Sequence, residues 1–338
     1  MADPTPAPAT TPTAGPSGPD GPGGPDGPGD GPRRHPGKLT TPDDAAQRHG
    51  LDTDVAYRSQ GRMVLTRFLR HRAAMTSLAV LVAFVLFVYV APLFLGYSLT
   101  DLSAGSYEPP STAHVFGTDQ VGADTLSLVM KGSQFSLQIG LVATLIATGL
   151  GLLLGTLGGY LRGLTDTAVS RVTDLFLILP VQAAAAVLII AFGGSWYLVA
   201  LALGLFLWMP IARISRAEAL ALSQREFVEA ARAAGASTWR IISRHLVPNM
   251  IGTLVVNATL TVATAVLTEA ALSFIGLGVQ IPDTSLGLVI NQNYTQLATR
   301  PWLFWAPFTA IVLISLTINF IGDGLRDAFD PRQDRGRR

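Results

Sequence analysis

Few side chains in this 338-residue sequence have the spacing of a catalytic or metal-binding motif. There is no cysteine, which excludes a disulfide, a thiolate metal site and a cysteine nucleophile. The phosphate-binding pattern G-x-x-x-x-G-K-[ST] is missing, so we expect no hydrolysis of nucleotides by this chain. No two histidines have the H-x-x-x-H spacing of a helical metal site; they are His35, His49, His71, His114 and His245.

Two carboxylates, Asp174 and Glu269, lie inside long apolar stretches. An ionisable group costs ~2.5–3.5 kcal/mol at the centre of a bilayer, so both should face protein or water. An integral-membrane enzyme would need a nucleophile and a base, or two convergent carboxylates. These two fall near opposite ends of their stretches, which argues against such an enzyme. Asp174 follows Arg171 by three residues, and this spacing predicts an i, i+3 ion pair on one helix.

The composition is typical of a protein embedded in lipid. Hydrophobic residues make up 49% of the chain and charged residues 14%, whereas soluble domains contain about 25% charged residues. Six apolar stretches are long enough to cross a ~30 Å hydrocarbon core as helices. They lie at about 73–95, 135–161, 168–192, 195–213, 250–276 and 302–322. We therefore predict an all-α integral membrane fold with six transmembrane helices. A secondary transporter often shows internal repeats with broken helices, which we do not find.

Two further segments precede the first apolar stretch. Residues 1–55 are predicted to be a disordered tail, because twelve of the 22 prolines and no aromatic residue fall in the first 50 positions. Residues 56–72 alternate arginine with apolar side chains, which predicts a basic amphipathic segment on an anionic membrane surface. Residues 73–332 would form the transmembrane domain. With the N-terminus inside, 18 arginines are cytoplasmic against Lys131 and Arg300 outside, so both termini should be cytoplasmic.

Small residues and prolines within the stretches predict how the helices pack. The pattern Gly151-x-x-x-Gly155-x-x-x-Gly159 allows close approach of two helix backbones, either within the bundle or against a second subunit. Pro180 is expected to kink the third stretch. Asn257 and Asn319 are expected to form hydrogen bonds between helices.

The loop at about 214–248, between the fourth and fifth stretches, has the pattern of two short helices. Its first half is rich in Ala, Glu and Arg and stops at Gly235, which suits a left-handed C-terminal cap. Ser237 would cap a second helix, which Pro248 would delimit. A two-helix lever anchored to two spans suits docking into a groove on a partner and transmitting its movement. The alternative is an ordinary solvated loop, in which Glu229 pairs with Arg225 or Arg232.

Five motifs resemble a known family in order and spacing. The loop sequence E-A-A-x-x-x-G, from Glu229 to Gly235, resembles the signature of permease subunits of ABC importers. The segment 116–124 resembles the external G-T-D-x-x-G-x-D segment of the dipeptide/oligopeptide/nickel permease family. Residues 162–180, 269–278 and 322–327 resemble it as well. The likeness covers about residues 60–332 and matches the second, C-type permease subunit. Ala123 and Leu128, where arginines are expected, and Leu286, where tryptophan is common, depart from the family pattern and leave the solute open.

This resemblance implies a type I ABC importer permease fold and a non-catalytic subunit that binds no cofactor itself. The loop would couple to two partner ATPase subunits, which use ATP and Mg²⁺. The coupling residues would be Glu229, Ala230, Ala231, Gly235, Ser237 and Pro248. Glu269 and Asn257 would line the translocation pathway; Glu269 could instead contact the partner permease or cap the following helix.

The same resemblance implies a set of partners and a location. A homologous permease would complete the pathway, and an extracytoplasmic solute-binding protein would deliver di- or oligopeptides, with nickel or another small solute as the alternative. No nucleic acid is expected as a partner. The machine would lie in a bacterial or archaeal cytoplasmic membrane.

Overall fold

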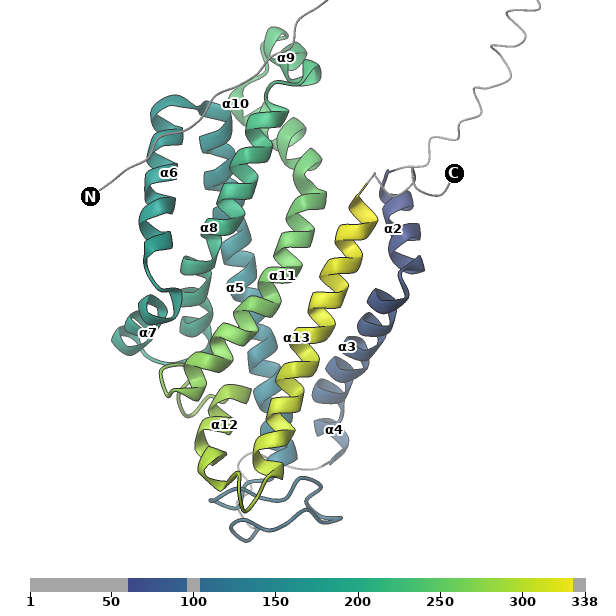
Figure 1. Cartoon of the computed structure of the whole chain (residues 1–338), viewed down its shortest axis with the longest axis vertical. Helices are drawn as coiled ribbons and strands as arrows, with labels where there is room; N and C mark the ends of the chain where they lie inside the picture. The colour runs from purple at the N-terminus through teal and green to yellow at the C-terminus, as the bar shows by residue number, and fades with distance from the viewer. Residues whose placement is uncertain (1–59, 96–103, 331–338) are drawn as a thin grey trace, which may run out of the picture. The chain divides into compact units, whose positions relative to one another are not determined.

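The structure, a computed structural model, describes residues 60–95 and 104–330, which form a helical domain (Figure 1). The predicted disordered tail at 1–55 lies outside these residues. Within the described ranges the one extended pairing is an isolated bridge between Thr118 and Asp124, so the all-α class is confirmed. The helices are α2 (Gln60–Arg70), α3 (Arg72–Val90), α4 (Pro92–Leu95), α5 (Thr125–Leu161), α6 (Gly163–Ile178), α7 (Val181–Phe192), α8 (Trp196–Leu222), α9 (Glu226–Ala233), α10 (Thr238–Ile241), η1 (Ile242–Leu246), α11 (Val247–Phe274), α12 (Leu286–Asn293), η2 (Tyr294–Gln296) and α13 (Trp302–Phe329).

Five helices of the described chain are each long and apolar enough to cross a membrane. They are α3 with α4, α5, α8, α10 to α11, and α13. The third predicted span, at 168–192, is instead the pair α6 and α7, which meet at an angle of 87°. Pro180 has no N–H to continue the hydrogen bonds of α6, and Leu179 before it is extended, with ψ of 131°. The change of direction expected at Pro180 is therefore much sharper than a kink.

The α5 helix packs against α8 through three glycines. A Cβ atom added at Gly151 would lie 2.7 Å from the carbonyl oxygen of Trp208, and one added at Gly159 would lie 2.5 Å from that of Arg216. Gly155 faces Ala212 between them. Side chains do not pack this closely against backbone, so the separation of the two helices requires glycine. The sequence allowed the three glycines to pack either within the bundle or against a second subunit. The structure shows them packed within the bundle, against α8.

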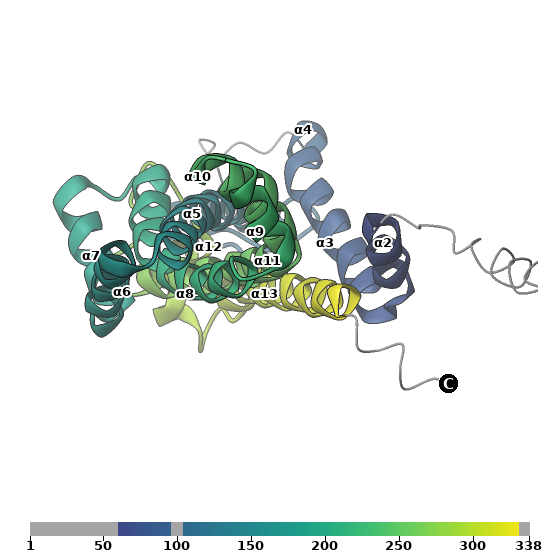
Figure 2. The ribbon, with the colours of Figure 1, turned by 90° about the horizontal axis from the view of Figure 1, so that it is seen from above.

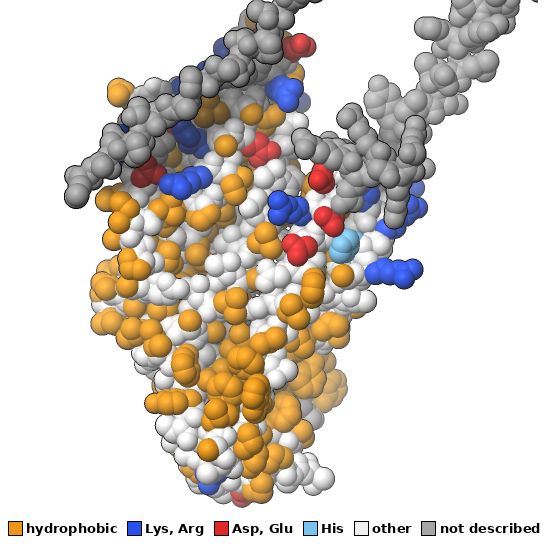
Figure 3. Space-filling view, in the orientation of Figure 1, with side chains coloured by type: hydrophobic (Ala, Val, Ile, Leu, Met, Phe, Trp, Pro, Cys, Tyr) orange, Lys and Arg blue, Asp and Glu red, His pale blue; other side chains and the backbone are white. Residues whose placement is uncertain are grey.

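The α11 helix belongs to both large apolar cores of the domain. One core joins α11 to α5, α7 and α8 and includes buried residues of α9 and η1. The other joins α11 to α5, α12 and α13. Figure 2 shows α6 and α7 at one side of the bundle and α2 and α3 at the other. Figure 3 shows hydrophobic side chains over much of the visible face, with Lys and Arg gathered toward the end that holds α9 and α2. Because α11 contributes to both cores, a displacement of α11 would move residues on both sides of the bundle.

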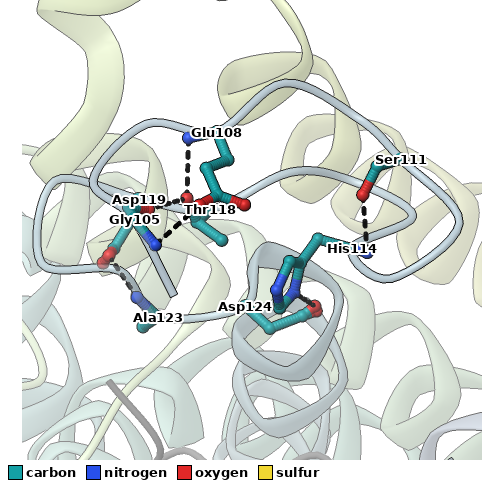
Figure 4. A network of polar contacts seen from close by, with 8 residues as sticks. All are labelled: Gly105, Glu108, Ser111, His114, Thr118, Asp119, Ala123 and Asp124. Atoms are coloured by element: carbon teal, nitrogen blue, oxygen red, sulfur yellow. Dashed lines mark hydrogen bonds and ion pairs between the residues drawn. The ribbon is translucent and has the colours of Figure 1, made fainter. Parts of the chain in front are cut away.

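Residues 104–124 form a loop that leads into α5 and is held by its own hydrogen bonds (Figure 4). The hydroxyl of Thr118 donates to the carbonyl of Gly105 at 2.6 Å and accepts from the N–H of Glu108 at 2.8 Å. The carboxylate of Asp119 accepts from the N–H of Ala123 at 2.8 Å. These bonds fix a segment that has no regular secondary structure.

Asp124, directly before α5, is a buried carboxyl group at the end of this loop. Its burial raises the pKa of the carboxyl, against the lowering effect of His114, whose Nδ1 lies 3.9 Å away (Figure 4). Because the pKa is raised in the folded state, the protonated Asp124 side chain stabilises the fold. This contribution is complete below the ordinary pKa of aspartate, about 3.9. It is lost as the pH rises through the raised pKa. Asp124→Asn stays neutral at every pH. We expect it to protect residues 104–124 from hydrogen exchange better than the unaltered chain does, by a margin that grows from pH 4 to pH 8.

The matched control for this prediction is Glu108→Gln, which neutralises an exposed carboxylate of the same loop. Each variant is compared with the unaltered chain at the same pH, so the pH dependence of exchange itself cancels. An equal margin for Asp124→Asn at pH 4 and pH 8 would contradict the prediction.

Candidate functional site: the helix–glycine–helix loop

The segment between α8 and α11 contains the predicted helix and glycine turn. At the end of α9, the N–H of Ala236 donates to the carbonyl of Ala231 at 3.0 Å, and the N–H of Gly235 donates to that of Arg232 at 3.0 Å. These two bonds define a Schellman cap. Gly235 has φ of 79°, a conformation that is unfavourable for residues with a Cβ atom. The predicted role of Gly235 as a left-handed cap is confirmed.

The second helix begins as predicted but does not end at Pro248. The hydroxyl of Ser237 accepts from the N–H of Arg240 at 3.4 Å and caps α10. From there α10, η1 and α11 run on as one helix of 37 residues. The N–H of Val247 donates to the carbonyl of Ile242, five residues back. This wider π-turn changes the hydrogen-bond pattern directly before Pro248, where proline has no N–H to donate, and the helix continues.

The α9 helix is anchored on one face and open on the other. Val228 has no exposed surface and belongs to the core shared by α5, α8 and α11. Glu229 and Ala230 are exposed, and Glu229 forms no ion pair within the described part of the chain. The alternative pairing of Glu229 with Arg225 or Arg232 is not observed. The Arg232 guanidinium instead lies over the Tyr160 ring, 5.6 Å from its centroid. The outward face of α9 therefore presents a carboxylate that has no ion-pair partner among the described residues.

A groove of about 960 Å³ runs beside the glycine turn. Its lining residues are Ala231, Ala234, Ala236, Ser237, Trp239, Arg240, Ser243, Arg244, His245 and Pro248. Trp239 is 64% exposed although tryptophan is among the most hydrophobic side chains. A large aromatic ring beside arginines is the composition found at the energetic centres of protein interfaces. The predicted coupling residues Gly235, Ser237 and Pro248 are all exposed on this unit.

Two ion pairs tie α6 to α8, and neither follows from local spacing. Asp174 pairs with Arg213 at 2.8 Å and not with Arg171, so the predicted i, i+3 pair is wrong. Asp166 receives two hydrogen bonds from the guanidinium of Arg216, one of them at 2.8 Å. The two pairs join α6 to α8 at different points: Asp166 lies in the first turn of α6, and Asp174 lies nearer to the 87° bend at its other end.

Arg216→Gln is expected to destabilise the domain more than Arg213→Gln. The Asp166–Arg216 pair is bidentate and its side chains are 23% and 36% exposed, whereas the Asp174–Arg213 side chains are 53% and 58% exposed. Exposed pairs contribute about 0.2–1 kcal/mol, and forked arginine pairs contribute more. The measurement is thermal unfolding in detergent, followed by tryptophan fluorescence. Equal shifts of the unfolding temperature in the two variants would contradict the ranking.

Glu269, predicted to line the pathway, has no exposed surface. Its carboxylate accepts from the hydroxyls of Ser136 on α5 at 2.9 Å and of Ser273 at 2.7 Å. Those hydroxyls in turn accept from the N–H groups of Leu286 at 3.3 Å and Val279 at 3.0 Å. The carboxylate therefore joins α5, α11 and the start of α12. In this conformation Glu269 lines no open surface of the subunit, and its observed role is to hold these helices together.

Removal of the Glu269 carboxylate should release α12. Glu269→Ala would leave two buried hydroxyls without their acceptor, and each such group costs about 1–3 kcal/mol. Glu269→Gln keeps the shape and one acceptor oxygen, so its effect should be smaller. Hydrogen exchange of residues 275–293 measures the outcome. If this segment exchanges equally in both variants and in the unaltered chain, the carboxylate does not hold α12.

The remaining predicted residues have local partners. The amide of Asn257 donates to the carbonyl of Thr253 at 2.8 Å, and that of Asn319 donates to Ser315 at 2.9 Å. Both bonds lie within one helix, so the expected bonds between helices are not found. Asn257 is half-buried, and its place in the pathway stays a prediction. Leu286, a departure from the family pattern, is fully buried and does not face solute in this conformation.

Sequence reasoning missed three features of this site: the buried anchor Val228, the π-turn η1 and the exposed Trp239. Val228 is an apolar residue of a short amphipathic helix, but the exposed Phe227 beside it fits the same pattern, so the pattern did not select the anchor. The π-turn was signalled by a proline that follows a helical sequence without a turn residue. The exposure of Trp239 had no signal in the sequence.

Comparison with known proteins identifies the family. A family model described as binding-protein-dependent transport system inner membrane component matches residues 147–335, and one for the N-terminal TM domain of oligopeptide transport permease C matches residues 59–110. Oligopeptide transport system permease protein OppC of Mycobacterium tuberculosis (strain ATCC 25618 / H37Rv) is 40% identical over 81% of this chain and 96% of the relative. OppC of Escherichia coli (strain K12) is 40% identical over 82% of this chain and 93% of the relative.

A solved structure is also similar in part. A chain of the MetNI methionine ABC transporter in inward-facing conformations has a TM-score of 0.48 and 24% sequence identity, over 61% of this chain and 98% of that chain. The relatives are named as transport permeases, in agreement with a non-catalytic membrane subunit. The chain therefore belongs to the inner membrane components of binding-protein-dependent transport systems, as a C-type ABC importer permease subunit of the dipeptide/oligopeptide/nickel permease family.

Proposed function

We propose that this chain forms, with a homologous permease, the translocation pathway of an ATP-driven importer of oligopeptides. An extracytoplasmic solute-binding protein delivers the peptide, and two ATPase subunits hydrolyse ATP with Mg²⁺. The observation that carries the proposal is the exposed helix–glycine–helix unit, which is anchored by Val228 and continues without a break into α11. The relatives named as oligopeptide permeases support the solute class.

The coupling step follows from the continuity of α10, η1 and α11. When the ATPase subunits close, they displace the exposed face of α9 and the groove beside Gly235. Because α10 to α11 is one helix, the displacement reaches the two apolar cores that α11 shares with its neighbours. Packed helices shift between discrete arrangements rather than deform continuously. The pathway thereby alternates between an inward- and an outward-facing state.

The orientation in the membrane is part of the proposal. The bias of 18 arginines against two basic residues favours cytoplasmic termini and a cytoplasmic coupling loop. A reporter that is active only in the cytoplasm should function when fused after residue 338 or inserted at Gly235, and should be inactive in the 104–124 loop. Reporter activity in the 104–124 loop would show that the chain has the opposite orientation in the membrane.

The function is tested with the assembled importer in proteoliposomes. The chain is expressed with its neighbouring permease, ATPase and binding-protein genes and purified by a tag on this chain alone. We expect an ATPase to co-purify, with hydrolysis stimulated by the peptide-loaded binding protein and accumulation of labelled peptide. If the binding protein instead delivers nickel, Ni²⁺ accumulates and labelled peptide does not. Purification without any ATPase would contradict the proposal for either solute.

A further inference from the structure

A second groove of about 550 Å³ opens between α2, α11 and α13. Its wall is mainly apolar and includes Leu65 and Phe68 of α2, Ile251 and Val255 of α11, and Phe329 of α13. Leu65 is 57% exposed and Ile251 is 50% exposed. The groove lies at the ends of α11 and α13 nearest to the basic helix α2 (Figure 1). It therefore combines exposed apolar walls with the most arginine-rich helix of the described chain.

Arginines stand at the edges of this groove, and the acidic groups of α13 point away from it. Arg62 and Arg326 are exposed and each directly follows a lining residue, Gly61 or Leu325. Neither arginine forms an ion pair with a described residue. Asp327 lies 3.4 Å from His71, on the opposite side of α13 from Leu325.

Asp323 lies one turn from Asp327 along α13 and so shares its face. Arg67 on α2 donates to the carbonyl of Asp330 and ties α2 to the end of α13. On the α11 side, the hydroxyl of the lining residue Thr253 donates to the half-buried carboxylate of Glu218 on α8 at 3.0 Å. The exposed charges at the edges of the groove on α2 and α13 are those of Arg62 and Arg326.

We propose that this groove binds one anionic glycerophospholipid of the adjoining leaflet. An acyl chain lies against Leu65, Ile251 and Val255, and Arg62 and Arg326 contact the phosphate and its anionic headgroup. Arginine binds phosphate oxygens through paired N–H groups. Juxtamembrane arginines attract anionic lipid by an amount equivalent to about fivefold in affinity for each residue. The exposed apolar side chains Leu65 and Ile251 suit an acyl chain, and the arginines at the edges suit its anionic headgroup.

The bound lipid touches the helix that carries the coupling movement. Pro248 lines both this groove and the coupling groove. Ile251 and Val255 follow it on the helix that begins at Thr238. A lipid bound between α11 and the pair α2 and α13 changes how readily α11 shifts. ATP hydrolysis by the importer should therefore depend on anionic lipid. This consequence rests on the proposed function; the binding of the lipid does not.

The experiment compares two forms of the assembled importer. One carries the double substitution Arg62→Gln and Arg326→Gln, and the other carries the single substitution Arg70→Gln. Arg70 is exposed on α2 but lies on the helix face opposite Gly61, Val64, Leu65 and Phe68, so it is the matched control. Native mass spectrometry counts phosphatidylglycerol retained from nanodiscs with equal phosphatidylglycerol and phosphatidylcholine. We expect the control to retain one more phosphatidylglycerol than the double variant, whose affinity falls about 25-fold for two arginines. Ile251→Trp, which fills the groove without changing charge, should also lose that lipid.

Two readouts separate the lipid site from the transport proposal. The ATPase rate with phosphatidylglycerol, divided by the rate in phosphatidylcholine alone, should fall to one in the double variant and stay unchanged in the control. Lipid retention without any ATPase activity would support the lipid site and contradict the proposed function. The lipid site is overturned if the double variant and Ile251→Trp retain as much phosphatidylglycerol as the control. It is also overturned if a helix of the partner permease fills the groove in the assembled importer, or if phosphatidylcholine is retained equally well.

Discussion

Gly235→Pro is expected to abolish solute-stimulated ATP hydrolysis while the subunit still inserts and assembles. Gly235 has φ of 79°, whereas the proline ring restricts φ to about −65°. The substitution also removes the N–H that donates to the carbonyl of Arg232. A misplaced proline costs about 3 kcal/mol or more, so the population of loops with the docking conformation should fall on the order of a hundredfold. The measurement is ATPase activity with the loaded binding protein in proteoliposomes.

Two controls distinguish loss of the turn from loss of a contact. Gly235→Asn should retain most activity, because asparagine tolerates the left-handed conformation and keeps the N–H. A Cβ atom at this position meets no atom within 4 Å, so the effect of proline is confined to the backbone. Glu229→Ala removes an exposed carboxylate without disturbing the fold of α9 and should lower coupling by a smaller factor. Full activity of Gly235→Pro would show that the turn does not transmit the movement.

Gly155→Leu is expected to prevent stable folding of the membrane domain. The α5 and α8 backbones meet at Gly155 and Ala212, and a Cβ atom alone would already collide with the α8 backbone. The three glycines are spaced by four residues, as are the α8 residues that they face, so one added side chain separates the helices along the whole contact. Overpacking of a core costs about 1–3 kcal/mol when side chains can adjust, and backbone adjusts less.

The matched control for Gly155→Leu is Gly149→Leu. Gly149 lies on the same helix, is exposed, and has no atom within 4 Å of an added Cβ. Size-exclusion chromatography of the detergent-solubilised protein gives the yield of monodisperse subunit, and thermal unfolding gives its stability. We expect a normal yield for Gly149→Leu and loss of monodisperse protein for Gly155→Leu. Gly155→Ala should give an intermediate unfolding temperature. If all three variants behave alike, close contact between α5 and α8 is not what stabilises the domain.

The sequence alone determined those features that depend on composition or on a few neighbouring residues. The mean hydropathy of long stretches predicts helices that cross a membrane, because unpaired backbone groups are costly in lipid. Gly235 predicts a left-handed cap and Ser237 a helix start for reasons contained in single residues. The family motifs at 116–124 and 229–235 likewise lie in continuous segments. All of these predictions could be made from the chain because their causes are local.

Only the tertiary structure decided which partner each polar or small residue has. Asp174 has Arg171 within reach on its own helix but pairs with Arg213 on α8. Glu269 stood inside an apolar stretch with several roles open to it, and the structure shows it buried, with its carboxyl group bonded to Ser136 and Ser273. The pattern at Gly151–Gly159 allowed two packing partners, and the position of α8 selected one. Such contacts join residues far apart in the chain, so their energy depends on how the helices pack and not on spacing along the sequence.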